Sequence, residues 1–304
     1  MSIWRASVGN MAKIALIQPE QAAIGLNRIA LGIEYNGSEF CGWQRQVQAC
    51  GVQTVLEQAL AKVAGQPVAV VAAGRTDSGV HASGQVVHFD TAVSRPWTAW
   101  VRGVNAFLPS SVAVLWAHPV SLDFHARFSA TARSYRYVLL NHPVRPALNA
   151  GRVGWYHALL DVTKMQQAAD LLVGEHDFSS FRAAECQAKS PVRVLRRLQV
   201  TRLDEQIVFE LTANAFLHHM VRNIVGALIY VGQGKYSPDW LAELLQQRDR
   251  TRAAPTFAAA GLHLCHVEYD AAWGLPNQCY SCNSSGRSQS DQLRQAEAIR
   301  SILT

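Results

Sequence analysis

The residues best placed to do chemistry lie in a short polar loop between two apolar runs. The loop reads Gly-Arg-Thr-Asp-Ser-Gly over residues 74–79 and contains one cation, Arg75, one hydroxyl, Thr76, and one carboxylate, Asp77. The runs at 68–73 and 85–89 predict buried strands on either side. A charged loop held between core strands is a common place for catalysis or binding. The alternative is that Asp77 only closes a turn through its own backbone.

A second group of candidate residues lies in the apolar segment 217–231, whose residues fall at helical spacing. Arg222 lies at the edge of the apolar stripe, and His218 lies four positions before it on the same flank. A buried guanidinium is costly unless it meets a carboxylate, so Asp77 is the expected partner of Arg222. His218 and His219 are adjacent, and two adjacent residues of a helix cannot both point at one metal ion. The pattern therefore disfavours a zinc site.

Basic residues are concentrated in two tracts. Residues 95–145 contain six arginines and one acid with aromatic residues interleaved, and residues 182–202 contain six basic residues and one acid. Arginine combined with aromatic side chains suits a phosphate backbone with unstacked bases. The net charge of +6 is also compatible with an anionic partner. An ordinary solvated surface above core aromatics explains the same tracts equally well.

The composition, with 49% hydrophobic and 16% charged residues, predicts a globular protein. The six cysteines show no disulfide framework. Cys279 and Cys282 form a lone C-x-x-C motif, and the isolated cysteines are Cys41, Cys50, Cys186 and Cys265. The first residues lack the apolar core of a signal peptide, and no apolar run approaches the roughly 18 residues of a membrane span. We therefore expect a soluble protein of the reducing cytoplasm, without a membrane partner.

The predicted elements follow the order β-α-β-β-α-β twice. The first set comprises strand 28–35, a helix over 52–63, strands 68–73 and 85–89, a helix opened by Pro96, and strand 112–118. The second set comprises strand 131–140, a helix over 161–174, a hairpin of 192–202 and 207–213, the helix 217–231 and strand 262–269, with a short extra helix after Ser237.

This order predicts an α+β fold of two ferredoxin-like halves, with a central, mostly antiparallel sheet and a cleft between the halves. We expect an N-terminal extension at 1–27, an N-terminal half at 28–123 that carries the Asp77 loop, and a C-terminal half at 124–270. A polar tail rich in Ser, Gln and Asn follows at 271–304.

Several motifs resemble those of the tRNA pseudouridine synthase A family. The matching segments are 33–46, 74–82, 124–137, 177–183, 213–226 and Arg-Asp-Arg-Thr at 248–251, spread over about residues 28–270. Ser78 stands where the family often has alanine, and both termini extend beyond the usual core. The resemblance implies a pseudouridine synthase fold and a homodimeric isomerase without cofactor or metal. Its reaction would convert uridine to pseudouridine at positions 38, 39 and 40 of the tRNA anticodon stem-loop.

By motif position, the resemblance implies that Asp77 is the nucleophile, that Tyr135 stacks on the target base, and that Arg222 pairs with Asp77. Arg75 would help to expel and hold the flipped base. The other implied tRNA contacts are Arg95, Phe124, His125, Ala126, Arg127, Phe128, Glu185, Cys186, Gln187, Ala188 and Lys189. Whether Asp77 attacks the sugar or the pyrimidine ring is open at this point.

Two other functions use some of the same features. A non-catalytic RNA-binding chaperone would use the basic, aromatic surface, but a carboxylate at position 77 would weaken phosphate binding there. A metal-dependent hydrolase could be built from His218 and His219 with Cys279 and Cys282. Neither alternative uses all the motifs together, whereas the isomerase does.

Overall fold

The computed structural model describes residues 25–46 and 50–276, and its strands form one large sheet. The strands are β1 (Asn27–Tyr35), β2 (Val71–Ala72), β3 (His81–Thr91), β4 (Val112–Val120), β5 (Ala130–Asn141), β6 (Gly154–Tyr156), β7 (Gly174–Asp177), β8 (Val192–Leu203), β9 (Gln206–Ala213) and β10 (Leu262–Tyr269). Their order is β4-β1-β3-β10-β5-β9-β8-β7, with β2 paired to β3 and β6 to β5. All pairs are antiparallel except β10–β3 and β5–β6, so the fold is mixed α+β with a mostly antiparallel sheet.

The N-terminal unit contains α1 (Val52–Ala64) and the strand order β4-β1-β3-β2. The helix buries Val52, Leu56 and Leu60 on one face because they recur at helical spacing. It ends where Gly65 takes a left-handed conformation and donates its N–H to the Ala61 carbonyl. The predicted helix and its end are confirmed.

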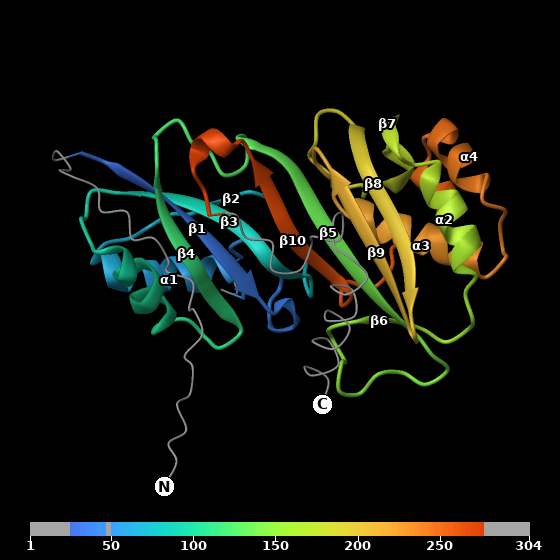
Figure 1. Ribbon diagram of the computed structural model, residues 1–304, viewed down its shortest axis with the longest axis horizontal. Helices are drawn as coiled ribbons and strands as arrows, with labels where there is room; N and C mark the ends of the chain where they lie inside the picture. Colours follow the sequence, from blue (N-terminus) through green and yellow to red (C-terminus); the bar gives the residue numbers. More distant parts are fainter. Residues whose placement is uncertain (1–24, 47–49, 277–304) are drawn as a thin grey trace, which may run out of the picture.

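The C-terminal unit contains α2 (Val162–Asp170), α3 (Met220–Gly232) and α4 (Trp240–Gln247), and its strand order is β10-β5-β9-β8. Asp161 caps α2 by accepting a hydrogen bond from the Lys164 N–H, as predicted. Nearly every residue of α3 is buried, so this helix forms the centre of the C-terminal core. Figure 1 shows α1 at one end of the molecule and the other three α-helices at the opposite end.

The two units meet along strands β3, β10 and β5. Each unit has its own apolar core, and Tyr135 on β5 packs against both of them. Strand β10 is the last strand of the C-terminal unit, yet it pairs with β3 of the N-terminal unit, His263 opposite His81. The sheet is therefore continuous across the junction. Side chains in this region are held by hydrogen-bonded strands of both units, which suits a functional site.

Several element boundaries differ from the sequence predictions. Only Val71 and Ala72 of the predicted strand 68–73 pair in the sheet, and β6 and β7 were not predicted. The helix after Pro96 contains a π-helical turn, Ala99–Gly103. Strands this short carry too few alternating positions to show a period. Residues 1–24 of the extension predicted at 1–27, residues 277–304 of the tail predicted at 271–304, and the Cys279–Cys282 motif lie outside the described residues.

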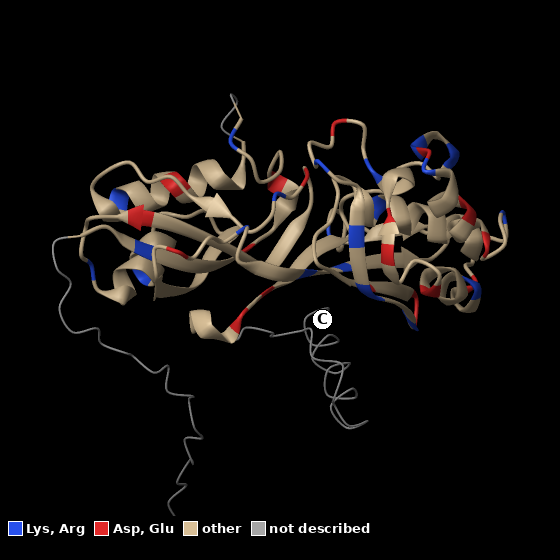
Figure 2. Cartoon of the chain, turned by 90° about the horizontal axis from the view of Figure 1, so that it is seen from above, with Lys and Arg blue, Asp and Glu red and all other residues tan. Residues whose placement is uncertain are grey.

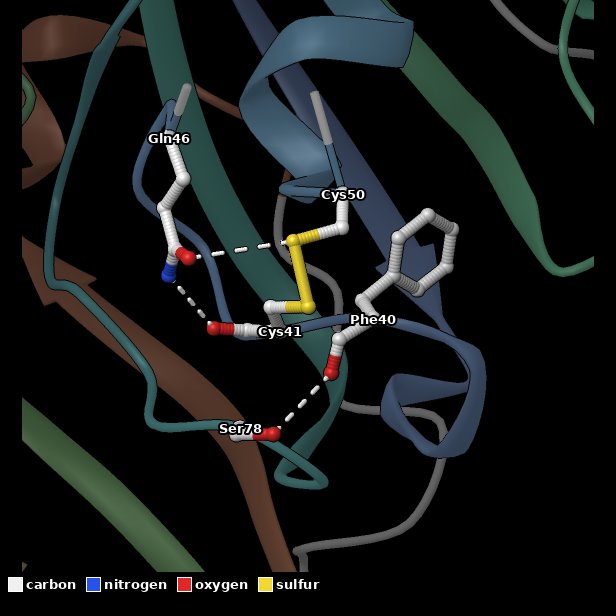
Figure 3. The surroundings of a disulfide bond; sticks show 5 residues. All are labelled: Phe40, Cys41, Gln46, Cys50 and Ser78. Carbon is white, nitrogen blue, oxygen red and sulfur yellow. Dashed lines mark hydrogen bonds between the residues drawn. A yellow bond between two sulfur atoms is a disulfide. The ribbon is translucent and has the colours of Figure 1, made fainter. Parts of the chain in front are cut away.

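The prediction that Cys41 and Cys50 are isolated is wrong, because they form a disulfide (Figure 3). Their Cα atoms are 5.4 Å apart, and the Cys41 N–H donates to the Cys50 carbonyl at 3.0 Å. The bond closes the loop between β1 and α1, a contact that depends on loop folding and leaves no mark in cysteine spacing. A reducing compartment therefore cannot be argued from these two residues.

No helix of the described residues is long and apolar enough to cross a membrane.

Candidate active site

The loop that carries Asp77 is held by buried hydrogen bonds on both sides. Gln85 of β3 donates its side-chain N–H to the Gly74 carbonyl at 2.7 Å. The Tyr35 hydroxyl at the end of β1 lies 2.8 Å from the Thr76 hydroxyl oxygen. Both Gln85 and Thr76 are buried, so these bonds form away from water and fix the loop firmly.

A neighbouring loop supports the turn from the other side. Trp43 donates its backbone N–H to the Thr76 carbonyl at 2.9 Å. Gly42 has φ +102°, and a Cβ there would lie 2.9 Å from the same carbonyl oxygen, so no other residue fits without movement. Ser78 donates to the Phe40 carbonyl at 3.3 Å, which places the Cys41–Cys50 loop directly against the Asp77 loop (Figure 3).

The Asp77 side chain does not serve the turn. The turn itself uses the Asp77 backbone carbonyl, which accepts the Val80 N–H at 3.1 Å. The carboxylate instead accepts a hydrogen bond from Arg222 on α3, Nη1 to Oδ2, at 2.9 Å. Arg222 also donates Nε–H to the Phe257 carbonyl at 2.8 Å, so the guanidinium is fixed at two points. The predicted pairing of Arg222 with Asp77 is confirmed.

The two histidines also face the carboxylate. His218 Nε2 lies 3.3 Å from Asp77 Oδ1, and His219 Nε2 lies 3.3 Å from Oδ2. Helix α3 begins only at Met220, and His219 has φ +61° in the left-handed region. The prediction that these adjacent residues cannot point at one metal ion is therefore wrong, because it assumed a helix through both of them. Burial, together with the positive charge of Arg222, lowers the pKa of His219 although Asp77 opposes the change.

Tyr135 lies on β5 at the junction of the two cores. Its ring packs edge-on against Phe216, with centroids 5.0 Å apart and an angle of 81°. Burial raises the pKa of the Tyr135 phenol, and the proximity of Tyr35 and Asp77 raises it further. The phenol is consequently neutral at neutral pH, and the ring is a partly buried aromatic surface near the carboxylate.

The segment 124–128 divides into buried and exposed residues. Phe124 and Ala126 are fully buried, and the Ala126 N–H donates to Nδ1 of His88 at 3.1 Å. Phe128 is 75% exposed and stacks on His125 at 4.3 Å between centroids, with the Arg127 guanidinium 5.5 Å from its ring. Of the predicted contacts in this segment, the side chains of His125, Arg127 and Phe128 are available to a substrate. Phe124 and Ala126 are buried and anchor the segment in the core.

Arg133 joins this segment to the Asp77 loop, and sequence reasoning missed it. From β5, its guanidinium donates to the carbonyls of Ala73 at 3.0 Å, Arg127 at 2.6 Å and Asn214 at 3.0 Å. Burial lowers the pKa of this guanidinium. The available signal was an arginine on the same strand face as Tyr135, where burial requires several hydrogen-bond acceptors.

The segment 185–189 lies against the histidines. Cys186 Sγ accepts the backbone N–H of His218 at 3.4 Å. The Arg182 side chain donates to the Ala188 carbonyl at 3.0 Å and so fixes the segment 185–189 from within. The exposed members of this segment are Glu185, Gln187 and Lys189. The structure thus brings this predicted contact segment against His218, whose side chain faces Asp77.

Arg75 and Arg95 differ in their distance from the site. Arg75 is exposed beside Asp77 in the same loop. Arg95 follows β3, whose 11 residues span roughly 30 Å from the Asp77 loop to the far end. The Arg95 side chain donates to the Val63 carbonyl at 3.3 Å, at the end of α1. Any contact that Arg95 makes with a substrate lies far from Asp77.

Several arginines of the two basic tracts form ion pairs with glutamates of the sheet. Arg136 and Arg197 both pair with Glu210, at 2.8 and 3.3 Å, and Arg196 pairs with Glu268 at 3.1 Å. Acidic and basic residues are intermixed over the molecule in Figure 2. The tracts therefore overstate the number of cations that are available to bind phosphate.

Comparison with known proteins finds relatives that match most of this chain. A family pattern described as tRNA pseudouridine synthase matches residues 32–129 and 168–270. A tRNA pseudouridine synthase A from Thiobacillus denitrificans is 61% identical over 249 residues, which cover 82% of this chain and 96% of that protein. The protein of the same name from Chromobacterium violaceum is 60% identical over 253 residues, covering 83% and 97%. One from Nitrosomonas eutropha is 59% identical, covering 82% and 90%.

Proposed function

The chain belongs to the tRNA pseudouridine synthase family, and we propose that it isomerises uridine to pseudouridine in tRNA with Asp77 as the nucleophile. The observation that carries the role of Asp77 is its carboxylate, which a rigid loop presents to Arg222 at 2.9 Å. A carboxylate is a competent covalent nucleophile, and the hydrogen bond from Arg222 holds this one in a fixed direction. The relatives' shared name supports tRNA as the substrate.

The reaction fits a site of this composition. The N-glycosidic bond to N1 of uracil breaks, a bond from C5 to the sugar C1′ forms, and the C5 proton leaves while N1 regains one. No electrons are gained or lost overall, so a nucleophile and a proton acceptor suffice. Asp77 would hold either the sugar or the pyrimidine ring while the base turns.

Tyr135 and Arg75 have distinct roles in this proposal. A uracil in a stem-loop must leave the stack before it can react, and an aromatic ring can receive it. The Tyr135 ring lies at the junction near Asp77, and its raised pKa favours a stacking role over that of a base in the resting enzyme. Arg75, exposed beside Asp77, is positioned to occupy the space that the base leaves.

We propose further that the exposed aromatic group of His125, Arg127 and Phe128 and the segment 185–189 contact the anticodon stem-loop, with modification at positions 38, 39 and 40. Stacking of an exposed ring on an unpaired base is sequence-tolerant, which suits an enzyme with several target positions. Arg95 would contact phosphates at a distance from the reacting base.

The larger organisation is part of the same proposal. The orders β4-β1-β3-β2 and β10-β5-β9-β8 repeat one pattern, which supports two ferredoxin-like halves with a substrate cleft at their junction. The family resemblance supports a homodimer that works in the cytoplasm, where tRNA is processed. The boundaries 28–123 and 124–270 describe the two halves.

The test is the nearly isosteric variant Asp77→Asn. Pseudouridine in unmodified tRNA is measured by mass spectrometry, and tRNA affinity is measured by filter binding. We expect affinity within a few-fold of wild type and no product, with exposed Asp239→Asn as the matched control that keeps both. Substantial product from Asp77→Asn would reject the nucleophile. A protein that binds tRNA but never yields pseudouridine, even as wild type, would favour the RNA-binding chaperone.

A further inference from the structure

Three potential metal ligands converge at the Asp77 carboxylate, and no role in the proposed reaction requires all of them. Among the described residues, one ligand atom each from Asp77, His218 and His219 lies within 4.8 Å of the others. We propose that this cluster is an inhibitory binding site for a divalent transition-metal ion such as Zn²⁺. The proposed metal binding does not depend on the proposed function. The proposed inhibition does, because it requires Asp77 to be the nucleophile.

The distances suit a small tetrahedral ion. Zinc bonds to imidazole nitrogen and carboxylate oxygen at about 2.0–2.1 Å, so neighbouring ligand atoms in a tetrahedral site are about 3.3 Å apart. His218 Nε2 lies 3.3 Å from Oδ1 of Asp77, which matches this spacing, whereas His219 Nε2 lies 3.3 Å from the other oxygen, Oδ2. All three ligand atoms lie within 4.8 Å of one another, so an ion at Oδ1 requires the His219 ring to turn toward that oxygen. The left-handed conformation of His219 is what turns the two adjacent rings to the same carboxylate.

The arginine beside the cluster weakens binding without blocking it. Arg222 donates to Oδ2 of Asp77, whereas His218 is nearest to Oδ1. An ion bound at Oδ1 can thus coexist with the guanidinium, although the two positive charges repel each other. Two imidazoles and one carboxylate favour Zn²⁺, Co²⁺, Ni²⁺ or Cu²⁺ over Mg²⁺ and Ca²⁺, which prefer oxygen ligands.

The site is accessible and lies on the proposed nucleophile. The His218 side chain is 40% exposed, so an ion can reach the cluster from solvent. Three protein ligands leave a fourth position for water or for a phosphate oxygen of bound RNA. A carboxylate oxygen that coordinates a metal ion is a weaker nucleophile and is held in one direction, so turnover should fall when the ion is bound.

The binding test uses Co²⁺ as a spectroscopic probe on the full-length protein. We expect one equivalent of Co²⁺ to give visible absorption bands that Zn²⁺ displaces and Mg²⁺ does not. His219→Asn should weaken binding by about tenfold or more, and asparagine tolerates the left-handed backbone, so the helix start is kept. Exposed His157→Asn is the matched control and should bind as wild type. Equal binding by wild type, His218→Asn and His219→Asn would overturn the site.

Thiol ligation is distinguished by spectrum and by substitution. Binding through Cys186 or the Cys279–Cys282 motif would add sulfur charge-transfer bands and would disappear in a triple Cys→Ser variant, and that result would also overturn the site. For inhibition, each variant is compared with its own rate in EDTA. Wild type should lose turnover with Zn²⁺ and regain it with EDTA, and His218→Asn should need about tenfold more Zn²⁺. Bound metal with unchanged turnover would reject the inhibition alone.

Discussion

At the scale of the residue, Asp77 is defined by side chains that lie far from it in the sequence. Arg222 is 145 positions away, and its guanidinium is itself anchored on the Phe257 carbonyl. The Nη1–H of Arg222 donates to the carboxylate, and the Nε–H bond to Phe257 fixes the guanidinium, so the carboxylate is held in one orientation. The pairing could be predicted from sequence because a guanidinium at the edge of an apolar helix requires a carboxylate. The contribution of the histidines could not, because it depends on one left-handed residue.

The role of Arg222 can be separated from its charge. Arg222→Lys keeps the positive charge but cannot hydrogen-bond the Asp77 carboxylate and the Phe257 carbonyl at the same time. We therefore expect a partial loss of the single-turnover rate. Arg222→Met removes both and should lower that rate by about a hundredfold or more, because the nucleophile is mispositioned. Arg248→Met, whose side chain is 67% exposed in its pair with Asp177, is the control. A wild-type rate for Arg222→Met in a folded protein would argue against the role.

At the scale of the element, periodic segments were predictable and short or irregular ones were not. Helix α1 and the hairpin of β8 and β9 have regular apolar spacing and clear turns, and both are found close to the predicted bounds. The two-residue β2 and the delayed start of α3 depend on tertiary contacts that periodicity does not encode. The Cys41–Cys50 disulfide belongs to the same class, since its partners meet only through the fold of a loop.

Arg133 on β5 hydrogen-bonds three segments that are far apart in the sequence, so its loss should act on the site and on stability together. Arg133→Gln would leave the carbonyls of Ala73, Arg127 and Asn214 without their shared donor. We expect the free energy of unfolding to fall by about 1–3 kcal/mol, because carbonyls that are only partly shielded from water lose their partner. We also expect weaker tRNA binding, because the 124–128 segment loosens. Urea unfolding and filter binding measure the two effects.

A matched substitution separates this effect from general loss of charge. Arg197→Gln removes a surface arginine that is paired with Glu210 and should change stability by less than about 1 kcal/mol. If Arg133→Gln were as stable as Arg197→Gln, the connecting role assigned to Arg133 would be wrong.

At the scale of the whole molecule, the sheet that joins the two cores buries titratable groups along its strands. His88 on β3 is 4% exposed, and its Nδ1 accepts the Ala126 N–H, which requires that nitrogen to be unprotonated. Burial lowers the pKa of His88 to about 4, and the charges of Arg28 and His125 add to the effect while Asp90 opposes it. His263 on β10 behaves alike, with burial and the nearby His81 lowering its pKa to about 4.

These groups predict acid sensitivity with a defined window. A histidine whose pKa is lowered by folding binds its proton more readily in the unfolded chain, so stability falls as pH drops from about 6.5 towards 4. At pH 4.5, His88 alone should cost about 2.5 kcal/mol relative to pH 7.5, at about 1.4 kcal/mol per pKa unit. Below that window the Asp90 carboxylate, whose pKa is lowered by its hydrogen bond and charge interaction with Arg28, contributes in the same direction.

The contribution of His88 can be measured with a residue that keeps its hydrogen bond. In His88→Asn the amide oxygen takes the position of Nδ1 and can accept the Ala126 N–H without titrating. The difference in unfolding free energy between pH 7.5 and 4.5, measured in urea, should therefore shrink by about 2.5 kcal/mol. The exposed His157→Asn should leave that difference unchanged. An equal pH dependence for His88→Asn and wild type would mean that protonation of His88 does not control the acid stability of this protein.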